Sequence, residues 1–167
     1  MATVNFTRGS AAEGTHVSGL SNRVPYMVER VVDFAEVTTT KGSALANWEI
    51  VQVINVPANT LLHGAVAEVL TVDASTAATF DLDVAEGDDF VDGGDLSTLG
   101  YVAVGTNGLA PFGANTVLPT SASDTIDLKI IAPGSVAPAS GKVRVTAWMT
   151  DASSLSLGGV ATRDYLA

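Results

Sequence analysis

The sequence contains no cysteine, and this absence excludes three kinds of chemistry. Disulfide bonds, thiol nucleophiles and thiolate metal sites all require that residue. Aromatic residues are also few, at 6% of the 167 residues, and the apolar content of 47% leans on alanine and valine. Small apolar side chains on many short strands favour a thin β-sandwich over a helical bundle. Stability must therefore come from packing or from oligomerisation.

Basic residues are scarce, with eight Lys and Arg against 18 Asp and Glu, which gives a formal net charge of −10. A surface of this sign repels phosphate backbones, so we expect no direct binding to nucleic acid. It equally disfavours anionic membranes. The simplest role of the acidic surface is to keep the protein soluble.

Long hydrophobic runs are missing as well. No segment approaches the roughly 20 apolar residues of a membrane span. The first residues, Met1 to Arg8, lack an apolar core of signal-peptide length. We therefore expect a protein that is made in the cytoplasm and does not associate with membranes.

Strand patterns fill the middle of the chain. Alternating apolar and polar residues, separated by turn residues, predict about eight strands and no helix. These strands span residues 26–37, 47–56, 63–72, 79–84, 100–104, 116–118, 125–132 and 141–151. In the last two, Ile126, Leu128 and Ile130, then Val143 and Val145, are expected to point inward. Evenly spaced strands joined by long loops predict an all-β fold, a single jelly-roll-like antiparallel β-sandwich.

The composition divides the chain into three parts. Residues 25–151 form the predicted sandwich domain, residues 1–24 an extended N-terminal arm, and residues 152–167 a C-terminal tail. The arm is rich in Gly, Ser, Thr and Ala. It is either a disordered leader or a strap that lies on a neighbouring subunit.

An acidic stretch lies within residues 79–104. Phe80, Leu82 and Val84 alternate with Asp81 and Asp83, which predicts one apolar face and one solvent-facing one. Several carboxylates follow in a Gly-rich loop, and hard oxygen ligands of this kind suit calcium. The candidate calcium ligands are Asp81, Asp83, Glu86, Asp88 and Asp89. The spacing matches no EF-hand, and the alternative is a solvated acidic loop.

No catalytic constellation can be defended. His16 and His63 are the only histidines, far apart in the chain, and no Gly-x-Ser-x-Gly elbow is present. A glycosidase would need two carboxyl groups at a set separation, which crowding in a loop does not establish. We expect no enzymatic activity and no cofactor. Trp48 and Trp148 either stack on sugars or pack in a core or a subunit interface.

Four blocks of sequence carry a resemblance. They are Val-Ile-Asn-Val-Pro-Ala-Asn-Thr at residues 53–60, Thr-Phe-Asp-Leu-Asp-Val at 79–84, Asp-Thr-Ile-Asp-Leu-Lys-Ile-Ile at 124–131, and Gly-Lys-Val-Arg-Val-Thr-Ala-Trp-Met at 141–149. In this order, behind a Gly/Ser/Ala-rich arm, they resemble small virion structural proteins of tailed bacteriophages. The resemblance extends over residues 25–151.

This resemblance implies a capsid decoration (cement) protein, made in the host cytoplasm and placed on the capsid exterior. Its partners would be the major capsid protein, whose shell it stabilises, and two further copies of itself in a homotrimer. Arms that order on binding and many weak contacts suit such a role. The expected shell contacts are Val4, Phe6 and Arg8 in the arm and Arg163, Tyr165 and Leu166 in the tail. The alternatives are a tail, fibre or vertex component of a virion, or a carbohydrate-binding β-sandwich module.

Overall fold

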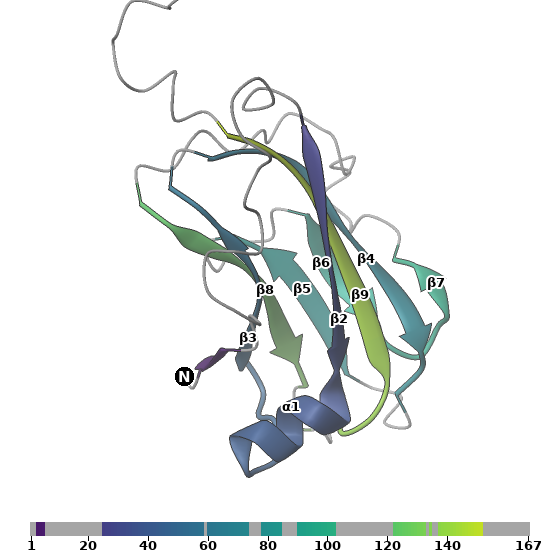
Figure 1. Ribbon diagram of the computed structural model, residues 1–167. Coiled ribbons are helices and arrows are strands. Elements are labelled where there is room, and N and C mark those ends of the chain that lie inside the picture. The colour runs from purple at the N-terminus through teal and green to yellow at the C-terminus, as the bar shows by residue number, and fades with distance from the viewer. Residues whose placement is uncertain are drawn as a thin grey trace, which may run out of the picture.

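Two β-sheets pack face to face in the computed structural model, which describes residues 3–5, 25–58, 60–73, 78–84, 90–102, 122–132, 134 and 137–151 (Figure 1). The five-stranded sheet has the spatial order β1 (Thr3–Asn5), β3 (Ile50–Val56), β8 (Asp124–Ile131), β5 (Thr79–Asp83) and β6 (Val91–Asp95). The four-stranded sheet has the order β2 (Tyr26–Asp33), β9 (Lys142–Asp151), β4 (Thr60–Thr71) and β7 (Gly100–Tyr101). Strand β1 runs parallel to β3, and the other pairs are antiparallel.

The order of strands β2 to β9 is that of a jelly roll. One sheet reads β2-β9-β4-β7 and the other β3-β8-β5-β6, so each long connection crosses from one sheet to the other. This is the double Greek key in which eight antiparallel strands close two sheets around one core. The predicted all-β sandwich is confirmed.

The core lies between the two sheets and is built from their inward-facing residues. The five-stranded sheet contributes Phe80, Leu82, Ile126, Leu128 and Ile130, all fully buried, and the four-stranded sheet contributes Val143, Val145, Ala147 and Met149. The alternation predicted for residues 125–132 and 141–151 is therefore confirmed. Small residues in β9 let the sheets approach closely, as the Ala- and Val-rich composition indicates.

The strand boundaries differ from the prediction in several places. The strand predicted at 47–56 begins only at Ile50, and the one predicted at 63–72 begins earlier, at Thr60. Strand β6 lies inside the acidic stretch for which the sequence predicts a loop. A register shift between Gln52 and Ile54 buries both Val53 and Ile54, which simple alternation places on opposite faces. The short strand predicted at 116–118 lies outside the described residues.

The prediction of no helix was wrong. The strand predicted at 26–37 ends at Asp33, and helix α1 (Phe34–Lys41) follows directly and covers one end of the sandwich (Figure 1). Phe34 and Val37, one helical turn apart, are both fully buried. The β-branched run from Val37 to Thr40 favours an extended chain. Burial of these two side chains and the helix caps outweigh that preference.

Both ends of α1 are capped. At the start, the Asp33 side chain accepts a hydrogen bond from the Ala35 backbone N–H at 3.0 Å. At the end, Gly42 adopts a left-handed conformation (φ 77°) and donates its N–H to the carbonyls of Thr38 and Thr39. An acidic N-cap and a C-terminal glycine with eight residues between them were the sequence signals for this helix.

We expect Asp33→Ala to lower the free energy of unfolding by about 1 kcal/mol, the usual cost of losing an N-cap. The Asp33 carboxylate also lies 2.9 Å from Lys142 Nζ, and this hydrogen bond, with that to Ala35, lowers the Asp33 pKa. A lowered folded-state pKa stabilises the protein above the unfolded pKa of about 3.9, and this contribution is lost as the pH falls through the folded value. Urea unfolding at neutral and acidic pH measures it. Asp33→Asn keeps a cap, so a cost equal to that of Asp33→Ala at pH 7 would contradict the capping role.

Candidate functional site

Trp48 stands out in the part of the chain that the structure describes. Its φ is 65°, whereas every other described residue with a positive φ is a glycine. A bulky residue in the left-handed region costs on the order of 1–3 kcal/mol and persists only where its surroundings enforce it. The indole is nevertheless 49% exposed, so the strain is not offset by burial of this side chain. Of the three roles predicted for Trp48, which are sugar stacking, core packing and interface packing, core packing is therefore wrong.

Backbone hydrogen bonds to β8 hold Trp48 in place. The Trp48 N–H donates to the Ile130 carbonyl at 2.8 Å, and the Ile130 N–H donates to the Glu49 carbonyl at 2.8 Å. Next to them, the Asn47 side-chain oxygen accepts from the Ala132 N–H at 2.7 Å. These bonds continue the β3–β8 pairing past the end of β3, so the exposed indole is attached to a rigid backbone.

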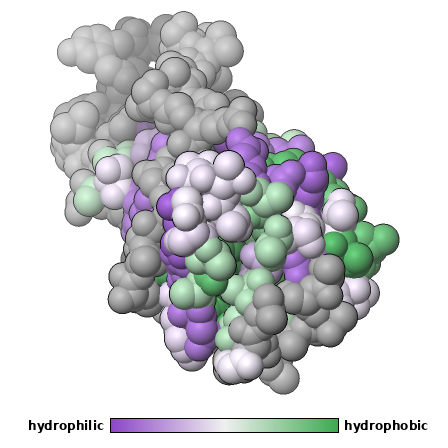
Figure 2. Space-filling model, turned by 90° about the horizontal axis from the view of Figure 1, so that it is seen from below, coloured by the Kyte–Doolittle hydropathy of each residue, from purple (hydrophilic) through white to green (hydrophobic). Residues whose placement is uncertain are grey.

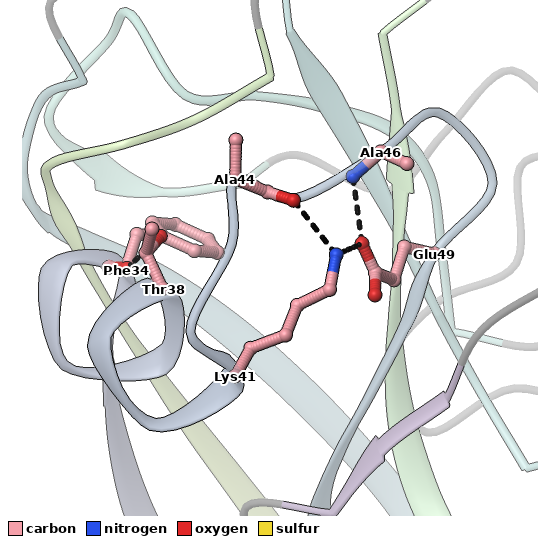
Figure 3. A network of polar contacts seen from close by, with 6 residues as sticks. All are labelled: Phe34, Thr38, Lys41, Ala44, Ala46 and Glu49. Atoms are coloured by element: carbon pink, nitrogen blue, oxygen red, sulfur yellow. Dashed lines mark hydrogen bonds and ion pairs between the residues drawn. The ribbon is translucent and has the colours of Figure 1, made fainter.

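A buried ion pair fixes the loop in front of Trp48 (Figure 3). The Glu49 side chain is 1% exposed, and its Oε2 lies 2.5 Å from Lys41 Nζ at the end of α1. The same oxygen accepts the Ala46 N–H at 2.6 Å, and Lys41 Nζ donates to the Ala44 carbonyl at 2.7 Å. Helix α1 and the start of β3 are thereby tied to the loop between them. This network positions Trp48.

A shallow hollow of about 260 Å³ opens beside the indole on the outer face of the five-stranded sheet. Lys129 Nζ lies 4.9 Å from the centroid of the Trp48 ring, a cation–π distance. It also lies 3.8 Å from Asp81 Oδ2, and Asp81 Oδ1 accepts the Gly93 N–H at 3.0 Å. Asp92 completes the polar side. The hollow thus combines an aromatic surface with one ammonium and two carboxylate groups.

The prediction that Asp81 and Asp83 face solvent is wrong. Asp81 is 5% exposed and Asp83 1%, although both point away from the core. On the neighbouring β8, Lys129 pairs with Asp81, and Asp127 pairs with Asp83 and is 8% exposed. Alternation identifies the face that points away from the core, but it does not say whether that face is covered.

The predicted calcium site is only partly described. Asp81 and Asp83 lie on β5, whereas Glu86, Asp88 and Asp89 lie outside the described residues. Within the described ranges, no group of three or more His, Asp and Glu residues is arranged to hold a metal ion. Farther along, hydrogen bonds from Ser97 lower the Asp95 pKa. That carboxylate organises a turn. The calcium site remains a prediction.

The remaining chemical candidates lie apart from the hollow. His63 Nε2 is 2.7 Å from Thr150 Oγ1, a contact between β4 and β9 of the other sheet, and His16 lies outside the described residues. Of the expected shell contacts, only Val4 is placed, in β1 beside Val51. The others, Phe6, Arg8, Arg163, Tyr165 and Leu166, lie outside the described residues.

The outer face of the four-stranded sheet is amphipathic. Met27 and Val31 on β2 and Tyr101 on β7 are 59%, 43% and 73% exposed. Between them, Trp148 pairs with Met27, and Arg144 lies 3.5 Å from Glu68. We call these residues, Met27, Val31, Glu68, Tyr101, Arg144 and Trp148, the outer patch. Seen from the α1 end, the described surface mixes hydrophilic and hydrophobic residues, and strongly hydrophobic groups lie toward the side on which β7 is found (Figure 2).

Comparisons with known proteins add little beyond this geometry. No helix among the described residues is long and apolar enough to cross a membrane. No family model matches the chain, and no curated protein does. Among solved structures, the chain is similar to the capsid of Ralstonia phage GP4, with a TM-score of 0.49 and 14% identity over 96% of this chain and 100% of the other. At this score and identity the similarity identifies no activity, partner or site.

Proposed function

We propose that this protein is a structural component of a tailed-phage virion, a decoration (cement) protein on the outer surface of the capsid. On this proposal it binds the major capsid protein as a homotrimer and stabilises the assembled shell. It is not an enzyme and needs no cofactor. The acidic surface faces solvent and keeps the particles apart.

The observation that carries the proposal is where the four resemblance blocks lie in the fold. Residues 53–60 begin on β3 and end at the first residue of β4, and residues 79–84 lie on β5, residues 124–131 on β8 and residues 141–149 on β9. Three of these strands, β3, β8 and β5, are neighbours in one sheet, and β9 is central to the other. The blocks therefore form the framework of a jelly roll, an architecture used in viral capsid domains.

The composition of the outer patch supports a role in which this protein contacts other proteins of an assembly. Exposed Met27 and Tyr101, with Trp148 and Arg144 between them, belong to the residue types that are enriched at protein interfaces. We assign the shell as its partner. Because the chain carries a net charge of −10, this contact needs apolar area or basic groups on the shell.

The test is the copy number of this chain in purified particles, relative to the major shell protein. We expect a ratio of the same order as the shell protein. A trace ratio would assign the chain to a tail, fibre or vertex position instead. Complete absence from particles would refute a virion role.

We also expect that removing residues 1–24 weakens binding to shells by at least about tenfold, because multivalent attachment depends on every arm. Co-sedimentation with shells that lack the protein measures this. Met27→Asp, which places a charge in the outer patch and leaves the arm intact, is the matched variant. Shell binding unchanged by the truncation would refute the role of the arm, and binding unchanged by Met27→Asp would refute that of the outer patch.

A further inference from the structure

The hollow beside Trp48 is not used by the proposed capsid role, and its composition is unusual for an acidic, aromatic-poor surface. One of only two tryptophans in the chain is held at a strained φ with half of its surface exposed. The Glu49 network and the hydrogen bonds to β8 fix the backbone that carries it. A residue that is exposed, strained and rigidly held at once is better explained by a ligand than by the fold.

From this geometry we infer that the Trp48 hollow is a binding site for one sugar ring of a glycan. A pyranose has a face of C–H groups that packs on an aromatic ring, and hydroxyl groups around its edge that need donors and acceptors. The indole supplies the flat apolar surface. Asp92 supplies an acceptor and Lys129 a donor at the same hollow, and the buried Asp81 carboxylate lies 3.8 Å from the Lys129 ammonium and holds it there.

The size of the hollow agrees with a single ring. Its volume of about 260 Å³ lies below the range of roughly 300–1,000 Å³ that is usual for drug-sized ligands. The hollow is also shallow and lies on a sheet face, so most of a longer glycan would extend over the surface. We therefore expect weak binding per site, with a Kd on the order of millimolar. Several copies on one particle would strengthen it through multivalency.

Two other ligand classes fit the residues less well. A quaternary ammonium group also favours an aromatic face with carboxylates nearby, but its positive charge would be repelled by the Lys129 ammonium, which lies 4.9 Å from the ring centroid. A nucleotide base stacks on tryptophan equally well, but its phosphates would meet Asp81 and Asp92 on a chain of net charge −10. A neutral sugar carries no charge that Lys129, Asp81 or Asp92 would repel.

The test uses the full-length protein on an array of oligosaccharides built from neutral hexoses and N-acetylhexosamines. The strongest binder is then titrated by NMR. We expect Trp48→Gly to weaken binding by at least about tenfold, as for a central aromatic contact. Glycine accepts the positive φ, so the melting temperature should not fall. The matched control is Trp148→Phe, on the opposite sheet, which should bind sugar like the unchanged protein.

Three results would overturn the inference. One is the absence of any binder when the sugars of the array are also titrated by NMR to concentrations above the expected millimolar Kd, and another is equal affinity of Trp48→Gly for the best sugar. The third is saturable binding of choline, used as the quaternary ammonium probe, with no sugar bound. The result is separable from the capsid role, because Trp48→Gly should occupy particles at the same copy number as the unchanged protein.

Discussion

Replacing Lys41 by methionine is expected to lower the free energy of unfolding by about 3–5 kcal/mol, the usual cost of removing one partner of a buried ion pair. Glu49 is 1% exposed, and its Oε1 has no hydrogen-bond partner, so its charge is held by Lys41 and by the Ala46 N–H at Oε2. Methionine keeps the length of the lysine stem and removes the charge. The carboxylate would then remain buried with a single donor. Urea unfolding at pH 7 measures the change.

A double-mutant cycle separates the ion pair from the packing of the side chains. In Lys41→Met combined with Glu49→Gln the buried charge is gone, so we expect the double variant to be more stable than the sum of the single costs predicts, by at least about 1 kcal/mol. Exposed Lys142, in contact with Asp33, offers a matched control: Lys142→Met should cost far less than Lys41→Met. Additive costs at Lys41 and Glu49, or equal costs for the two lysine variants, would contradict the proposed role of the buried pair.

Much of the sandwich could be predicted because its strands follow simple periodicity. In β8 and β9 every inward position expected from alternation is buried. The helix could not be read in the same way, because only two of its eight residues, Phe34 and Val37, are buried, and they are one turn apart. Its capping residues, Asp33 and Gly42, were present in the sequence and were the better signal. Capping at both ends thus stabilised a helix in a segment whose β-branched residues favour an extended backbone.

The sequence indicated sugar stacking as one role of Trp48, but the site around it could not have been predicted. Trp48, Asp81, Asp92 and Lys129 are distant in the chain, and their meeting depends on which strands are neighbours and in which register. The positive φ of Trp48 follows from hydrogen bonds to Ile130 on β8 and has no local sequence signal. The carboxylates of the acidic stretch lie close together in sequence, and that spacing alone predicted a cation site. In the folded protein, Asp81 instead lies beside Lys129 of the neighbouring strand β8.

Gly94 gives the second large expected effect, because a side chain there would collide with the core. It lies directly opposite Phe80 in the β5–β6 pair, and a Cβ built at Gly94 would lie 2.7 Å from Phe80 Cζ and 2.8 Å from Cε1. Phe80 is fully buried, so its ring has no free space into which to move. We therefore expect Gly94→Ala to lower the free energy of unfolding by about 3 kcal/mol, measured with urea.

Two further variants distinguish the clash with the Phe80 ring from an effect of the backbone conformation. Gly93→Ala, at φ 70° with nothing within 4 Å of its Cβ, tests the conformational cost alone, and about 1 kcal/mol is expected. Phe80→Leu removes the far end of the ring, so Gly94→Ala should cost less in that background, by at least about 1 kcal/mol. If Gly94→Ala costs the same with leucine as with phenylalanine, the ring contact is not the reason for glycine at this position. A reduced cost would show that β6, a strand with two adjacent glycines, needs glycine at position 94 because the Phe80 ring of β5 packs against it.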